Sequence, residues 1–175
     1  VPAFYTVTTA SKHDSTAMSS IHYEPNAYYI FDRAYDSFKE LYRIHLTDSF
    51  FVVRAKTNLK YKTVKWKRRM PKNIMTDAEV KLTGYLSEKK YPESFRLVRY
   101  YDEEDDREFT FLTHAKQLSA LDVANLYKKR WLIELFFKWL KQHLKIKKFW
   151  GTTENAVRIQ ISVAIITYCL VAIVQ

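Results

Sequence analysis

The strongest constraint on the fold is the regular alternation of strand-like and helix-like segments in the first 58 residues. The apolar runs "NAYYIFD" at 26–32 and "SFFVVRA" at 49–55 are rich in β-forming residues and are typical of buried strands. Between them, the segment 37–47 has its apolar residues at helical spacing. A further alternating run, "AFYTVTT", precedes a short helix with Asp14 or Ser15 as N-cap. This alternation predicts an α/β fold.

The segment 59–115 has a different character and predicts an antiparallel β-rich insertion. Short alternating runs are separated by turn signals at Pro71, Gly84 and Pro92. The acidic run "DEEDDRE" falls between two of these strands, and a solvated hairpin tip is the preferred interpretation over a metal cluster. The expected strands are "YKTVKWK", "AEVKLTGYL", "SFRLVRYY" and "EFTFLTH".

The remaining residues, 116–175, predict two helices. Ser119 and Asp122 have the spacing of a capping box, and nothing breaks the helical pattern before Lys145. After Gly151 the chain ends in an apolar helix whose core, "ISVAIITYCLVAIV", is shorter than the ~20 residues that span a bilayer. A mostly buried core helix is therefore expected here, with no role in a membrane.

Composition narrows the possible functions. The net charge of +10 and the pI of about 9.5 favour a polyanionic partner such as nucleic acid, although a lysine-rich surface from a biased genome gives the same excess. Two glycines leave no room for a GxGxxG or Walker loop, which argues against a nucleotide cofactor. One cysteine excludes an internal disulfide and a Cys/His zinc site, and indicates a reducing compartment.

Polar residues form a narrow stripe on the long predicted helix, with Glu134 as its only acid. One interpretation is an exposed face on which Glu134 makes ordinary i,i+4 pairs. The other is a catalytic carboxylate beside cations that bind phosphate. The wide apolar arc favours the second, because it implies near-burial with the stripe facing a cleft. The stripe consists of Tyr127, Arg130, Glu134, Lys138, Lys141 and Lys145.

The spacing Y-x2-R-x3-E-x6-K, formed by Tyr127, Arg130, Glu134 and Lys141, resembles the YREK signature of the DDE insertion-sequence transposases. The run "FDRAY" at 31–35 resembles the second acidic motif of that family, an aspartate at a strand end followed by arginine. The block "ELFFKWLKQHLKIKKFWGTTENAV" is similar to the segment that follows the glutamate. The resemblance covers essentially the whole chain.

This resemblance implies a ribonuclease H-like fold, a mixed sheet flanked by helices, with a β-rich insertion between the second Asp and the Glu. The expected organisation is a first part of the core at 1–58, the insertion at 59–115, and the C-terminal core helices at 116–175. It further implies a bacterial cytoplasmic enzyme that acts on double-stranded DNA at transposon ends, typically as a homodimer.

The resemblance also implies roles for individual residues. Two Mg²⁺ or Mn²⁺ ions about 4 Å apart would catalyse phosphoryl transfer, with Asp32 bridging both and Glu134 holding one. In "KWKRRMPK", Trp66 would stack a displaced base, although a core tryptophan is the commoner outcome. The residues expected to contact DNA phosphates are Tyr127, Arg130, Lys141, Arg33, Lys138 and Lys145.

The first aspartate of a DDE site has no clear candidate in this sequence. "VPAFYTVTTASKHD" resembles the third strand of the fold, so two strands and the first Asp are expected before Val1, and helix capping is the default role of Asp14. We therefore expect a fragment that is truncated at both ends and that performs no strand transfer on its own. An inactive DNA-binding remnant and a ribonuclease H-fold nuclease without strand transfer stay open as alternatives.

Overall fold

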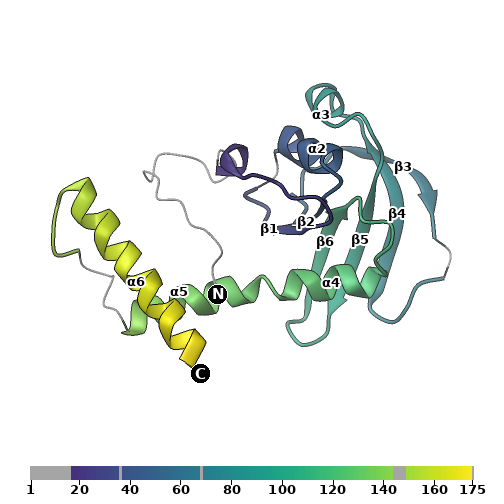
Figure 1. Cartoon of the computed structure of the whole chain (residues 1–175). Helices are drawn as coiled ribbons and strands as arrows, with labels where there is room; N and C mark the ends of the chain where they lie inside the picture. The colour runs from purple at the N-terminus through teal and green to yellow at the C-terminus, as the bar shows by residue number, and fades with distance from the viewer. Residues whose placement is uncertain (1–16, 36, 68, 144–148, 175) are drawn as a thin grey trace. The chain divides into compact units, whose positions relative to one another are not determined.

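The computed structural model describes residues 17–35, 37–67, 69–143 and 149–174 (Figure 1). The chain divides into two compact units, of which the larger ends at Arg130 and the second contains the residues from Trp131 onward. The opening strand-like run and Asp14 lie outside the described residues.

The larger unit is built on one six-stranded mixed sheet, which confirms the predicted α/β class (Figure 1). Its strands follow the order β1-β2-β6-β5-β4-β3, with β1 and β2 parallel and all other neighbours antiparallel. The four strands between 59 and 115 therefore continue the sheet that β1 and β2 begin. The strands are β1 (Tyr28–Phe31), β2 (Phe50–Arg54), β3 (Tyr61–Trp66), β4 (Ile74–Leu82), β5 (Phe95–Asp102) and β6 (Arg107–Thr113).

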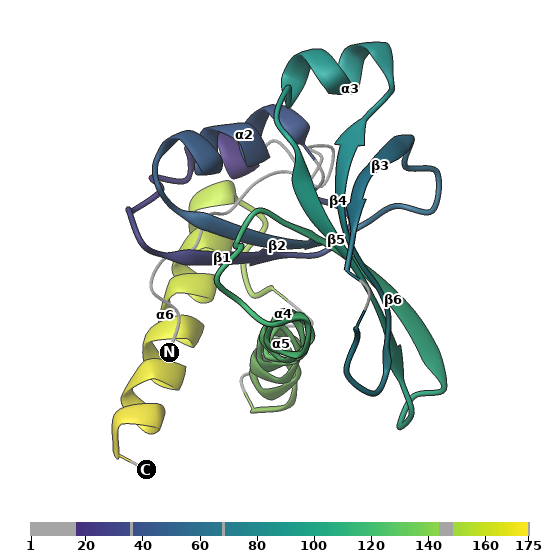
Figure 2. The ribbon, with the colours of Figure 1, turned by 90° about the vertical axis from the view of Figure 1, so that its right-hand side faces the viewer.

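Helices cover both faces of this sheet at its β1–β2 end (Figure 2). Successive residues of a strand point to opposite faces. Phe51 and Val53 of β2 accordingly pack in the core that includes residues of α2, whereas Val52 packs in the core formed with α4. Both faces are thus apolar, which is why β2 reads as a continuous apolar run. The helices are η1 (Met18–Ser20), α2 (Phe38–Leu46), α3 (Tyr85–Lys90) and α4 (Ala120–Lys128).

Two predicted boundaries of elements that begin in this unit are wrong. The run "AEVKLTGYL" was expected to be a single strand, but β4 ends at Leu82 and α3 begins at Tyr85, after Gly84 in extended backbone. The long helix was expected to continue past Lys145, but α4 ends at Lys128 and α5 begins at Trp131. The Arg130 N–H donates to the Tyr127 carbonyl at 2.9 Å, a tight i→i+3 turn of the kind that ends helices. No glycine or proline marks this break.

The second unit contains α5 (Trp131–His143) and α6 (Glu154–Val174). The Tyr168 ring of α6 packs edge-on against Phe136 at 4.7 Å and Trp139 at 5.2 Å. The expectation that α6 is mostly buried is wrong for the described residues, because Ala164 is its only buried side chain. By length and composition α6 could cross a membrane, a test that core helices of soluble proteins also pass.

A buried histidine lies just after β6. The His114 Nε2 donates to the Ser49 carbonyl at 2.8 Å, and within the described part of the chain its buried Nδ1 has no hydrogen-bond partner. The ring packs against Phe51 at 4.7 Å and against His45 at 4.6 Å. Burial, reinforced by the nearby charges of His45 and Lys116, lowers the pKa of His114 to about 4.

This histidine is expected to make folding stability depend on pH. Its pKa falls from the ordinary 6.5 to about 4 on folding, so the unfolded chain binds more protons between these values. The free energy of unfolding should therefore decrease by about 3 kcal/mol as the pH falls through this window. Urea unfolding at a series of pH values measures the effect.

His114→Gln should make the free energy of unfolding depend less on pH, since the amide still donates to the Ser49 carbonyl but does not titrate. His22→Gln, at an exposed position, is the matched control and should keep the wild-type profile. If the free energy of unfolding of His114→Gln fell with pH as steeply as that of the wild type, other groups would control stability in acid.

Candidate active site

Asp32 lies directly after β1, at the carboxyl end of the parallel pair β1–β2. Its Oδ1 accepts the Arg33 N–H at 2.7 Å, and its carbonyl accepts the Tyr35 N–H at 2.9 Å in a tight turn. The register pairs Phe31 with Val53, so the next residues, Asp32 and Arg54, lie side by side. The carboxyl ends of parallel strands are where open α/β sheets bind ligands.

Helix α4 brings Tyr127 to this aspartate from 95 residues away in the sequence. The Tyr127 hydroxyl donates to Asp32 Oδ1 at 3.0 Å. Its ring is buried against Phe111 at 4.7 Å and Phe109 at 6.2 Å. The predicted Ser119–Asp122 capping box is present and starts the helix. The start and the packing of α4 together place the phenol at the strand end.

Arg130 also reaches the aspartate. Its Nη1 lies 3.7 Å from Asp32 Oδ2, and its guanidinium lies 5.5 Å from the centre of the Tyr127 ring. The structure therefore brings together the aspartate of "FDRAY" and the first two residues of the Y-x2-R-x3-E-x6-K spacing. The Arg33 side chain, by contrast, is exposed.

The surroundings keep Asp32 ionised. Partial burial alone would raise the pKa of Asp32, but the Arg33 N–H, the Tyr127 hydroxyl and the positive charges of Arg130 and Arg54 together lower it. Burial and the nearby Asp32 charge raise the pKa of Tyr127, so the phenol stays neutral and keeps its proton for the hydrogen bond. The result is a partly exposed carboxylate, a hard oxygen ligand of the kind that Mg²⁺ prefers.

Arg54 is a residue of this site that was not predicted from the sequence. It ends β2, and its charge acts on both Asp32 and Tyr127. Its guanidinium lies 4.9 Å from the centre of the Phe109 ring. A signal was present, because "SFFVVRA" places an arginine at the end of the second buried strand just as "NAYYIFD" places an aspartate at the end of the first.

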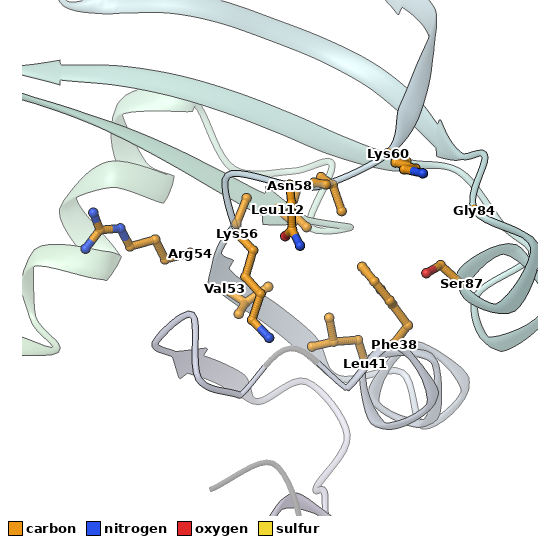
Figure 3. A pocket seen from close by; sticks show the side chains of 12 residues that line it. Phe38, Leu41, Val53, Arg54, Lys56, Asn58, Lys60, Gly84, Ser87 and Leu112 are labelled. Atoms are coloured by element: carbon orange, nitrogen blue, oxygen red, sulfur yellow. The ribbon is translucent and has the colours of Figure 1, made fainter. Parts of the chain in front are cut away.

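A pocket of about 260 Å³ opens beyond the end of β2 (Figure 3). Lys56 and Asn58 line it from the segment after β2, opposite Phe38 and Leu41 of α2, while Arg54 points away from α2 (Figure 3). Among the described residues, no acidic side chain lines the pocket. The described lining of this pocket therefore combines basic and apolar side chains.

In the second unit, Glu134 and Lys141 share one face of α5. With Lys138 they line a hollow of about 510 Å³, together with Phe137 and Gln142. The expected near-burial of this helix is wrong for the described residues, since Leu140 is its only buried side chain. Lys145 lies outside the described residues.

Trp66 is on β3, the edge strand of the sheet, and 60% of its side chain is exposed. The commoner outcome, a core tryptophan, is therefore wrong for this residue. Lys65 beside it on β3 is exposed as well.

A two-metal site needs several oxygen ligands close together. Among the residues that the structure describes, no three His, Cys, Asp or Glu side chains converge. In the larger unit Asp32 supplies one ionised carboxylate between two arginines. Glu134, the second expected ligand, lies in the other unit.

Known transposases match this chain over nearly its whole length. The family described as "Transposase DDE domain" matches residues 1–170. A protein of Sinorhizobium fredii named as transposase y4zB is 36% identical over 98% of this chain and 49% of its own length. A protein of Geobacillus stearothermophilus named as a transposase for insertion sequence element IS5377 is 31% identical over 97% of this chain and 45% of its own.

A third relative matches a shorter part of the chain. A Synechocystis protein named as a transposase for insertion sequence element IS4SA is 40% identical over 38% of this chain and 22% of its own length. The chain spans about half the length of the first two relatives. With the family match over nearly all of its residues, the chain belongs to the DDE-domain transposases of insertion sequences.

Proposed function

We propose that this chain is the catalytic region of an insertion-sequence transposase that cleaves and joins DNA strands with two divalent metal ions. The observation that carries the proposal is the contact of Asp32 with Tyr127 and Arg130, because it joins the two motifs of the resemblance at one strand end. Transposases act on DNA, and the net charge of +10 suits that polyanion.

In this proposal Asp32 and Glu134 hold the metal ions, Mg²⁺ or Mn²⁺. When bound, the ions activate the attacking water or 3′-hydroxyl and stabilise the leaving oxygen. The Tyr127 hydroxyl orients the Asp32 carboxylate through its hydrogen bond to Oδ1. Arg130 and Arg54 offset the negative charge that accumulates when DNA approaches this carboxylate.

The remaining cations are proposed to bind the DNA backbone. Lys141 and Lys138 flank Glu134 on α5, and Arg33 follows Asp32. Lys145 continues the same stripe in the sequence. Trp66 is proposed to stack a displaced base, which its exposure on the edge strand β3 permits. We further propose that the protein acts as a homodimer on the two ends of its element, in the bacterial cytoplasm.

Metal binding tests the proposed role of Asp32. Mn²⁺ is titrated calorimetrically into the protein bound to a DNA duplex, because phosphate oxygens complete the coordination of such ions. Asp32→Asn should weaken Mn²⁺ binding by about tenfold or more, since an amide is a poorer ligand than a carboxylate. Asp105→Asn removes an exposed carboxylate at the β5–β6 hairpin tip and should bind Mn²⁺ as the wild type does. Equal Mn²⁺ affinity in Asp32→Asn and the wild type would contradict the assignment.

A further inference from the structure

The ring of Phe109, on β6, has two guanidinium groups close to it. The Cζ of Arg54 lies 4.9 Å from the ring centroid and that of Arg107 lies 5.8 Å away. Guanidinium groups are attracted to aromatic ring faces at such distances. The ring is itself held by stacking on Phe111, with centroids 5.9 Å apart and planes only 6° from parallel.

The sheet register places this ring on the same face as the candidate site. Arg54 pairs with Phe111 across β2 and β6, so Arg54, Phe111 and Phe109 share the face that α4 covers. Phe109 also contacts the ring of Tyr127 at 6.2 Å. One side chain thus touches two of the groups that act on Asp32.

The Tyr127 and Arg54 side chains differ in how firmly contacts other than Phe109 hold them. Tyr127 has a hydrogen bond to Asp32 and a second ring contact with Phe111. Within the part of the chain that the structure describes, no hydrogen bond or ion pair from the Arg54 guanidinium is present. Its charge acts on Asp32 and Tyr127, and its close side-chain contact is the Phe109 ring. A long side chain without such restraint samples several rotamers, which weakens any bond it makes to a ligand.

We propose that Phe109 is a positioning residue for DNA cleavage, because its ring holds the Arg54 guanidinium next to Asp32 with its N–H donors available to a DNA phosphate. The proposal rests on the proposed function, in which Arg54 offsets phosphate charge at this carboxylate. Phe109 acts through Arg54 and touches neither DNA nor metal. An aromatic ring is required at this position, whereas apolar volume alone is not sufficient.

Binding of a fluorescent DNA duplex across a salt series tests the proposal. Phe109→Leu keeps an apolar side chain but removes the ring, and should weaken binding about fivefold. Because one phosphate contact is lost, the slope of log K against log salt should become shallower by about 0.9. Phe109→Tyr should restore both values. Arg54→Gln should bind as weakly as Phe109→Leu, and the double variant no more weakly than Arg54→Gln.

Tyr100→Leu is the matched control, because Tyr100 pairs with Phe109 on the neighbouring strand and packs in the same core, while the cation near its ring is Lys128 and not Arg54. It should bind DNA with the wild-type salt slope. The proposal is overturned if Tyr100→Leu weakens binding as much as Phe109→Leu, or if the effects of Phe109→Leu and Arg54→Gln multiply in the double variant.

A second measurement separates this proposal from the proposed function. Nuclear relaxation of the Arg54 Nε reports how rigidly the guanidinium is held, and it needs no DNA. The Nε should be ordered in the wild type and in Phe109→Tyr, and mobile in Phe109→Leu. Failure of the wild type to bind the duplex would contradict the proposed function, whereas an equally ordered Nε in Phe109→Leu would overturn the role of Phe109.

Discussion

Glu134→Gln is expected to slow metal-dependent strand cleavage by about three orders of magnitude or more, while DNA affinity stays near the wild-type value. The amide has nearly the shape of the carboxylate but neither its charge nor its affinity for Mg²⁺. Stabilisation of the transition state by a metal ion amounts to several kcal/mol, and each 1.36 kcal/mol is a factor of ten in rate. The affinity of Glu134→Gln for DNA should stay the same because the lysines of α5 are unchanged.

Nicking of DNA that carries the ends of the element measures the rate, and anisotropy of a labelled duplex measures the affinity. Glu154→Gln is the matched control, since Glu154 is another glutamate of the same unit and its exposed side chain pairs with Arg158. It should cleave at the wild-type rate. Cleavage by Glu134→Gln within tenfold of the wild type would remove Glu134 from the metal site.

The largest effect on stability is expected at the buried ion pair between β4 and β5. The Arg96 Nε and Nη2 donate to the two carboxylate oxygens of Asp77 at 2.6 and 2.7 Å, and its Nη1 donates to the Leu118 carbonyl at 2.5 Å. Both side chains are buried. Asp77→Asn leaves the arginine charge buried with one partner fewer, so the free energy of unfolding should decrease by about 3–5 kcal/mol.

The same strand offers a matched control. Arg99 and Glu108 form an ion pair of the same 2.6 Å length, but its side chains are 41% and 47% exposed. Glu108→Gln should change the free energy of unfolding by about 1 kcal/mol or less. Urea unfolding of both variants provides the comparison, and equal losses would mean that burial does not set the strength of these pairs.

The two buried ionisable sites should also destabilise the fold at different pH. Burial alone would raise the pKa of Asp77, but Arg96 and Lys67 lower it below the ordinary 3.8. Its stabilising contribution is therefore present above pH 3.8 and is lost as the pH falls through the lower, folded-state pKa. The loss from His114 begins near 6.5 and is complete near 4. Acid should thus weaken the fold first through the histidine and then through the aspartate.

Several features of the fold could be predicted from local sequence because they depend on residues close together in the chain. The strands β1 and β2, helix α2 and the capping box of Ser119 and Asp122 are present as expected. Residues 103–106 of the acidic run form the exposed turn between β5 and β6, as predicted, whereas Asp102 is buried at the end of β5. Hydrophobic periodicity and helix capping involve residues within a few positions of each other, so they can be predicted without knowing the tertiary structure.

The end of α4 and the exposure of α5 and α6 were not predictable in this way. The helical pattern runs unbroken through Arg130, and the break depends on a single tight turn rather than on glycine or proline. Apolar periodicity shows which face of a helix prefers to be covered, but not whether this chain supplies the cover. The wide apolar arc of α5 therefore does not mean that the helix is buried.

By itself the sequence determined the α/β class, the strand that ends at Asp32 and the motif spacing that carries Tyr127, Arg130 and Glu134. Only the tertiary structure decided that the Tyr127 hydroxyl meets Asp32 across 95 residues, and that Arg54 and Phe109 belong beside them. The physical reason is that such meetings depend on strand register and on the packing of α4 against the sheet. A shift of one residue in either strand would turn Arg54 or Phe109 to the opposite face, with no change in local pattern.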